Sequence, residues 1–240
     1  MTTNYLKLND GKTEFLVLWK KSVTLGGTNV KAVESARYIG AVLDSELCMT
    51  QHINSIVCSC YCHLRQIAHI RPHITQVATA TLVNCLITSR LDFMNSLLYG
   101  IPDYLLRKLE LIQNNAARIV CQKKKRDHVT PLFKTLHWLP IDFRIQFKIN
   151  LVTFKILHGL APAYLSSLLI PYAPSRTLRS SSQEQLIEKR ARCKRTGDRA
   201  FSVCAPRLWN ALPHTIRNSI SVASFKTALK TYYFKQAFTD

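Results

Sequence analysis

The sequence predicts a mainly α-helical fold: a small β piece at the N-terminus, a helical bundle in the middle and a basic helical region at the C-terminus. Three observations carry this prediction. Residues 1–48 hold short apolar runs between turn residues, whereas from Met49 apolar residues recur every three or four positions; these patterns distinguish strands from amphipathic helices. At Pro171 the composition shifts to a polar, basic linker. We therefore expect three regions, 1–48, 49–170 and 171–240.

Composition and charge narrow the function classes. The chain has 240 residues, of which 47% are hydrophobic and 20% charged, so it can bury a core. Its formal net charge is +19 and its isoelectric point about 9.9. The excess is uneven, with net values of +1, +9 and +9 for residues 1–50, 51–170 and 171–240. Such a charge attracts polyanions, chiefly nucleic acid or an anionic membrane surface.

Nothing in the sequence predicts export or membrane insertion. No apolar run approaches the roughly 18 residues of a membrane span. The stretch from Met1 to Leu6 has neither the basic start nor the apolar centre of a signal peptide. We therefore expect a cytoplasmic or nuclear protein, not a secreted one, in which the 8 cysteines stay reduced.

Residues 1–48 are predicted to form short strands. The candidates are Thr13–Leu18, Asn29–Val33 and Arg37–Leu43, which are short and apolar, the last two being rich in Val and Ile. Turns are expected at Asn9-Asp10-Gly11 and Gly26-Gly27, because these residues tolerate left-handed backbone. In the third strand, Gly40 is expected where another backbone comes close.

From Met49 the three-four spacing predicts successive helices. The first runs from an N-cap at Thr50 to Ile70, the second from Thr75 to about Ser89, and the third from Asp103 to about Cys121. Proline marks the start of three further helices. Thr130 is the expected N-cap of the first, with Pro131 at its first helical position. The second is long, begins after Pro140 and ends at His158-Gly159, and the third is a short helix over Pro162–Leu169.

The C-terminal region is predicted to be a basic linker followed by two helices. Pro174–Ser182 is polar and basic, as linkers are. A short helix is expected over Ala205–Pro213, between two prolines. A final amphipathic helix is expected to begin at Ser221, because Phe225, Leu229 and Tyr233 follow at helical spacing.

Three closely spaced cysteines, Cys58, Cys60 and Cys62, resemble a metal site at first sight. Structural zinc prefers ligand pairs two to four residues apart, with a second pair elsewhere, for which His69 and His73 are the candidates. The cysteines alternate within a helical pattern, however, and so point in different directions. We favour core and near-surface cysteines on a helix.

Two basic clusters are the candidate nucleic-acid contacts. The first comprises Arg118, Lys123, Lys124, Lys125, Arg126 and His128, and the second comprises Arg190, Arg192, Lys194, Arg195 and Arg199. The first cluster either offsets the dipole at a helix C-terminus or contacts phosphates. The second, if extended, aligns alternate side chains as a row suited to a phosphate backbone; a localisation signal is the competing interpretation.

Catalysis gets no support from the residues. The sequence has no glycine-rich phosphate loop, no GxSxG motif and no paired histidines at ligand spacing, and its eight aspartates are never neighbours. A two-metal phosphoryl-transfer site needs clustered carboxylates that hold cations about 4 Å apart. We expect no catalytic residue, metal or cofactor in this chain.

Residues 4–240 resemble the C-terminal part of the reverse transcriptase of non-LTR retrotransposons (LINE elements), of the jockey-like, chicken-repeat type. The matching stretches are NYLKLNDGKTEFLVL, ARYIGAVLDSEL, RLDFMNSLLYGIP, KLELIQNNAARIV, DHVTPLFKTLHWLPIDFRIQFKI, TFKILHGLAPAYL and GDRAFSVCAPRLWNALP. They are long, idiosyncratic and in the family's order. One departure is Glu188, an acid close to where the family pattern has Val-Pro-Arg, which weakens the basic row.

The resemblance implies a role for each region. Residues 1–48 would be the end of the polymerase palm with the primer-grip hairpin; there Lys12 would lie near the incoming nucleotide's phosphates, and Gly40 would let the primer strand approach. Residues 49–170 would be the helical thumb that holds template and primer. Residues 171–240 would be the basic C-terminal region, with nucleic-acid binding as its expected role.

The resemblance also implies that the catalytic aspartates, which bind the magnesium ions used by the parent enzymes, lie upstream of Met1. We therefore expect a fragment of an RNA-directed DNA polymerase that is inactive alone and binds RNA or DNA without sequence preference, and no membrane. Two alternatives remain. The chain is a domesticated interaction or nucleic-acid-binding module, or it is the non-functional product of a pseudogene.

Overall fold

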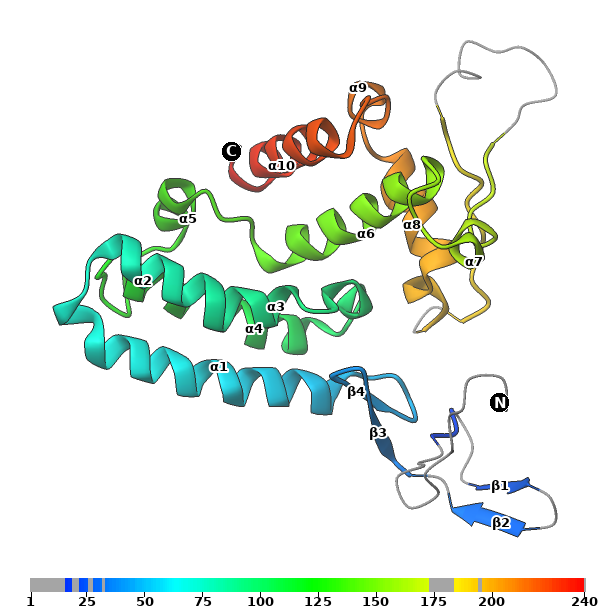
Figure 1. Cartoon of the computed structure of the whole chain (residues 1–240), viewed down its shortest axis with the longest axis horizontal. Coiled ribbons are helices and arrows are strands. Elements are labelled where there is room, and N and C mark those ends of the chain that lie inside the picture. Colours follow the sequence, from blue (N-terminus) through cyan, green and yellow to red (C-terminus); the bar gives the residue numbers. More distant parts are fainter. Residues whose placement is uncertain are drawn as a thin grey trace, which may run out of the picture. The chain divides into compact units, whose positions relative to one another are not determined.

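The computed structural model describes residues 16–18, 22–25, 28–31, 33–172, 184–193 and 196–239. These residues are mostly helical, with short strands near the N-terminus (Figure 1). The predicted mainly α-helical fold with a small N-terminal β piece is therefore confirmed. The contacts divide the chain into two compact units, Met1–Ser55 and Ile56–Asp240. The division into three functional regions stays a prediction.

The first β element is an antiparallel hairpin of β1 (Ser22–Leu25) and β2 (Thr28–Lys31), in which Leu25 lies opposite Thr28. β2 overlaps the strand predicted at Asn29–Val33. The turn predicted at residues 26 and 27 lies outside the described residues, as do the turn at 9–11 and the first half of the strand predicted over Thr13–Leu18. Leu16, within that predicted strand, makes a single parallel bridge to Val33.

The second β element is also a hairpin, formed by β3 (Ser35–Tyr38) and β4 (Ala41–Asp44). The prediction of one strand over Arg37–Leu43 is therefore wrong. The chain reverses at Ile39 and Gly40, whose φ angles are 45° and 88°, as in the two-residue turns that suit the twist of hairpins. The apolar Ile39 hid this turn in the hydrophobic pattern. The resemblance to reverse transcriptases also implies a hairpin at these residues. That the hairpin grips a primer stays a proposal.

The two residues that precede helix α1 (Thr50–Ile70) are hydrogen-bonded to the second hairpin. The Asp44 carboxylate accepts hydrogen bonds from the backbone N–H groups of Cys48 at 2.6 Å and Met49 at 2.8 Å. The Met49 carbonyl accepts the first helical bond, from Ile53 at 3.0 Å. Met49, with φ of 62°, therefore occupies the N-cap position that the sequence predicted for Thr50, and the Asp44 carboxylate fixes the two residues just before the helix.

The helices that follow agree closely with the predicted ones. They are α2 (Gln76–Val83), a π-helical turn η4 (Asn84–Thr88), α3 (Ser89–Asp92), a 3₁₀ turn η5 (Asn95–Leu98), α4 (Asp103–Val120), α5 (Thr130–Leu136), α6 (Ile141–Leu157) and α7 (Ala163–Ser166). Thr75 caps α2 by accepting from Ala78 N–H at 3.2 Å. At α5 the predicted boundary is wrong by one residue, because Thr130 is already helical and Val129 is the N-cap.

The C-terminal helices are α8 (Phe201–Asn210), α9 (His214–Arg217) and α10 (Val222–Phe238). The helix predicted between two prolines instead begins at Phe201 and contains Pro206 in its interior, at the cost of one backbone donor. The predicted start of α10 is confirmed: Ser221 accepts from Ser224 N–H at 3.1 Å, and the Ser224 hydroxyl accepts from Ser221 N–H at 3.1 Å, which is a reciprocal capping box.

Helix α6 lies at the centre of the core of the second unit. It packs against α4, α8 and α10, and Figure 1 shows it between α4 and α10. Phe154 of α6 stacks on Phe225 of α10 with ring centroids 4.3 Å apart, and Trp209 of α8 completes the cluster. Each of these three side chains is at most 1% exposed, so they join three helices in one aromatic core.

We predict that Phe225→Ala lowers the free energy of unfolding by about 3–5 kcal/mol, because it leaves a cavity between Phe154 and Trp209. Chemical denaturation followed by circular dichroism measures this loss. Phe93→Ala is the control, since the Phe93 side chain is 47% exposed and its truncation is expected to have a much smaller effect. Equal losses for the two variants would contradict the central role of the aromatic cluster.

Candidate nucleic-acid interface

The first basic cluster forms a compact turn directly after α4. The backbone N–H of Lys123 donates to the Arg118 carbonyl at 2.9 Å, and Asp127 N–H donates to the Lys124 carbonyl at 3.1 Å. The Asp127 carboxylate accepts from Lys124 N–H at 2.7 Å. The four cationic side chains from Lys123 to Arg126 are all exposed. The only acid in the turn is thus engaged with the backbone, and the cations face solvent.

Arg118 braces this turn from the last part of α4. Its Nε and Nη2 groups both donate to the Asp127 carbonyl at 3.2 Å, and Nη1 donates to the Asn115 side-chain oxygen at 3.5 Å. These acceptors are neutral, so they orient the guanidinium group without cancelling its charge. Arg118 therefore adds an oriented positive charge beside the four exposed ones.

Arg71, between α1 and α2, holds the C-terminal ends of α1 and α4 together. Its Nε donates to the Ile119 carbonyl and its Nη2 to the Val120 carbonyl, each at 3.1 Å. Carbonyls in the last turn of a helix lack intrahelical partners and carry the negative end of the helix dipole. A cation that binds them stabilises the end of α4 and positions it against α1.

Two hollows flank the basic turn. The first, which we call the α1–α4 groove, has a volume of 410 Å³ and is lined by Tyr61 and Arg65 of α1 and by Arg118, Lys123 and Lys125. The second, also of 410 Å³, is lined by Arg118, Arg126 and His128 together with aromatic residues of α5 and α10. Of the predicted cluster, only Lys124 lines neither hollow. The structure thus places the other five residues of the cluster along two neighbouring hollows that share Arg118.

Sequence reasoning missed Tyr61 and Arg65. They are one helical turn apart, so the sequence does place them on one face of α1. Nothing in the sequence says that this face lies beside α4. The packing does so: Asn115 of α4 donates to the Tyr61 hydroxyl at 3.3 Å.

The second basic cluster lies elsewhere in the same unit. Arg190 and Arg192 are exposed on an irregular segment that precedes α8, and Lys194 and Arg195 lie outside the described residues. Lys189 Nζ donates to the Leu168 carbonyl near α7 at 3.5 Å. Because α7 and α8 lie at the end of this unit opposite to α5 (Figure 1), the structure does not bring the two clusters together.

Arg199 has a structural role in the described chain. Its Nε donates to the Tyr99 carbonyl and its Nη2 to the Leu97 carbonyl, each at 3.1 Å. It also lies against Gly100, where φ is +66° and an added Cβ would come within 3.0 Å of the Arg199 side chain. Arg199 therefore anchors the start of α8 to the loop after η5.

Of the two site residues predicted in the N-terminal region, the structure describes only Gly40. Lys12 lies outside the described residues. Gly40 occupies the second position of the β3–β4 turn, is exposed, and has φ of 88°, a conformation that other residues rarely adopt. Its position is explained by the turn, and its contact with a primer strand stays a proposal.

The cysteine cluster follows the favoured interpretation. Cys60 is fully buried, and burial raises the pKa of its thiol to about 11, while Cys58 and Cys62 are exposed on other faces of α1. Among the described residues, no three His, Cys, Asp or Glu side chains are grouped so that they could hold a metal ion.

Three aspartates that are distant in sequence do line one hollow of 490 Å³: Asp103, Asp142 and Asp198. The carboxylates of Asp142 and Asp198 each interact with a neighbouring side chain. Asp142 accepts from the Gln146 amide at 2.7 Å, and Asp198 lies 3.5 Å from the Arg207 guanidinium. Two arginines line the same hollow, so its acidic charge is offset.

Comparison with protein-family models, with curated proteins and with solved structures found no match for this chain. The resemblance to reverse transcriptases therefore stays an expectation from the sequence motifs. Within the described part of the chain, no helix is both long and apolar enough to cross a membrane.

We predict that iodoacetamide at pH 8 labels Cys58 and Cys62 rapidly and Cys60 slowly. The thiolate is the reactive form, and at pH 8, well below the raised pKa of about 11, the buried Cys60 thiol stays protonated. Peptide mass spectrometry over a time course measures the three rates. Denaturation should equalise them. Fast labelling of Cys60 in the folded protein would contradict its burial.

Proposed function

We propose that this chain is a nucleic-acid-binding fragment of a non-LTR retrotransposon reverse transcriptase, in which α1, α2 and α4 act as a thumb-like unit that holds template and primer. The sequence motifs support the family, and the helical fold of residues 50–169 is compatible with it. The proposal assigns the chain no polymerase activity by itself. It concerns binding of RNA or DNA only.

The observation that carries the binding proposal is the charge of the α1–α4 groove. Arg65, Arg118, Lys123 and Lys125 line one hollow, and none of its lining residues is an acid. Cations that surround a concavity concentrate positive potential there and repel one another. A phosphate backbone relieves this repulsion and releases its own counterions on binding.

The chemistry of the groove favours contact with the backbone over reading of bases. Arginine and lysine contact phosphates in any sequence. The polar groups of Tyr61 and Asn115 bond to each other at 3.3 Å, so they are not free to discriminate between base edges. We therefore propose binding without sequence preference.

The exposed Arg190 and Arg192 supply a second, separate contact in this proposal. Since they lie at the other end of the unit from the basic turn, a strand that reaches both would be held at two points. Two linked contacts bind more tightly than either alone. The groove can nevertheless be tested by itself, because the two sites share no residue.

We predict that the variant R65Q/K123Q/K125Q binds a 20-base-pair duplex more weakly and with a shallower salt dependence. Each phosphate contact contributes about −0.9 to the slope of log K against log salt, so three lost contacts change the slope by about 2.7. Fluorescence anisotropy between about 50 and 200 mM salt measures it. Arg118 is left intact because it braces the turn.

The matched control is R107Q/K155Q/K235Q, which removes the same charge from α4, α6 and α10 away from the groove. Its slope should stay close to that of the unmodified protein. Identical slopes for the two triple variants would show that binding depends on net charge, and would refute the groove. Absence of any binding would refute the proposed function and favour a protein partner.

A further inference from the structure

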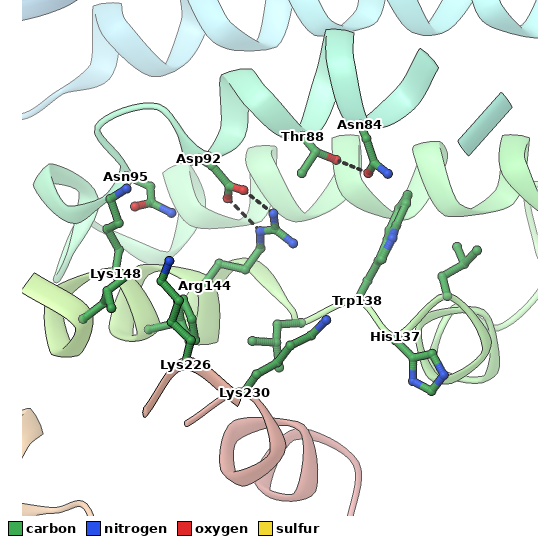
Figure 2. Close-up of a pocket in the computed structure, with 14 residues that line it drawn as sticks. Asn84, Thr88, Asp92, Asn95, His137, Trp138, Arg144, Lys148, Lys226 and Lys230 are labelled. Carbon is green, nitrogen blue, oxygen red and sulfur yellow. Dashed lines mark hydrogen bonds and ion pairs between the residues drawn. The ribbon is translucent and has the colours of Figure 1, made fainter. Parts of the chain in front are cut away.

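A hollow of 570 Å³ lies between η4, η5, α6 and α10 (Figure 2). We call it the α6–α10 pocket. Pockets of about 300–1,000 Å³ suit ligands of the size of a nucleotide. The pocket shares no residue with the α1–α4 groove, so whatever it binds is independent of the function proposed above.

The pocket carries an excess of positive charge. Its only carboxylate, Asp92, is paired with Arg144 of α6: Nε donates to Oδ1 at 2.8 Å and Nη2 donates to Oδ2. Three lysines remain, Lys148 of α6 and Lys226 and Lys230 of α10. No ion pair joins them to an acid within the described residues. Lys226 and Lys230 are one helical turn apart, where like charges repel. An anion bound here would relieve that repulsion.

The walls of the pocket supply aromatic and amide groups. Trp138, partly exposed, forms one end, and Asn84 lies near it (Figure 2). Asn84 stands on a π-helical turn, a form that is frequent at functional sites, and accepts from the Thr88 hydroxyl at 3.3 Å. The flat indole of Trp138 and the amide of Asn84 together suit a nucleobase, because a base stacks on aromatic rings and forms hydrogen bonds through its edge.

Asn95 gives an independent indication of a ligand. It lines the pocket at the end near Lys148 (Figure 2) and is only 3% exposed. Its side-chain oxygen has no hydrogen-bond partner. A buried acceptor without a donor is destabilising, and such atoms are rare in folded proteins. A hydroxyl or amine of a bound molecule would satisfy it.

We propose that the α6–α10 pocket binds a nucleotide, with the base against Trp138 and the phosphate among Lys148, Lys226 and Lys230. The ligand is recognised by two features together, an aromatic ring and a phosphate. It comes either from a free nucleotide or from the phosphorylated end of a strand.

The test measures binding of three probes by isothermal titration calorimetry: inorganic phosphate, adenosine monophosphate and a 5′-phosphorylated tetradeoxyadenylate. The monophosphate should bind at least about tenfold more tightly than phosphate, because stacking adds to the charge interaction. Because the oligonucleotide can also bind the α1–α4 groove, it is compared with the monophosphate in the groove variant R65Q/K123Q/K125Q. Tighter binding of the oligonucleotide there would identify a strand end as the ligand, and equal binding a free nucleotide. If neither nucleotide probe binds better than phosphate, the proposal is wrong.

The variants separate the two features of the site. K226Q/K230Q changes exposed residues of α10 and should weaken binding of the monophosphate at least about tenfold. W138L should reduce the monophosphate to the affinity of phosphate and leave phosphate unchanged. W138F, which keeps an aromatic face, should retain part of the preference, and circular dichroism checks that each variant is folded. A monophosphate affinity that is unchanged in K226Q/K230Q would overturn the proposal.

The groove variant R65Q/K123Q/K125Q is the control for independence. It should bind the monophosphate as the unmodified protein does, whereas K226Q/K230Q should retain the salt slope of duplex binding. Loss of monophosphate binding in the groove variant would show that the nucleotide binds in the groove, and would overturn the assignment to this pocket. Failure of one proposal is thereby distinguishable from failure of the other.

Discussion

Helix α6 is buried on more than one face, and this burial is the constraint on which the second unit depends. Ile145 and Ile149 are buried together with the polar residues Asn150 and Thr153. A polar group in such a place needs a partner. The Asn150 amide therefore donates to the Tyr233 hydroxyl of α10 at 2.6 Å, while Phe154 contributes to the aromatic cluster. α10 is thus held on α6 by this hydrogen bond, by the stack of Phe154 on Phe225 and by the ring contact of Phe143 with Tyr233.

The two candidate sites follow from this arrangement. The α6–α10 pocket exists because α10 packs on α6 and brings Lys226 and Lys230 toward Lys148. The α1–α4 groove depends on α4, which is fixed to the segment before α6 because the buried Gln113 amide donates to the Leu139 carbonyl at 2.8 Å. In both sites, therefore, buried amides position helices whose outer faces carry the cations.

Local signals in the sequence were sufficient for most helices. Thr75 and Ser221 are good N-caps and Gly159 adopts positive φ, so the ends of these helices were predictable. The hairpin at Ile39 was mispredicted from the hydrophobic pattern because an apolar, β-branched residue occupies its turn. The basic turn after α4 was predictable as a cluster. Its partners on α1 and the whole α6–α10 pocket were not, because they arise from packing between helices far apart in the chain.

The hydrogen bond between Asn150 and Tyr233 joins residues 83 positions apart, which has a consequence for the order of folding. Segments emerge from the ribosome in sequence, and contacts between distant segments form late. When α6 has formed but α10 has not yet been synthesised, Phe154 and the amide of Asn150 lack their partners. A nascent chain at that stage exposes an apolar helix face to chaperones and to other chains, and its solubility depends on the speed with which the next segments arrive.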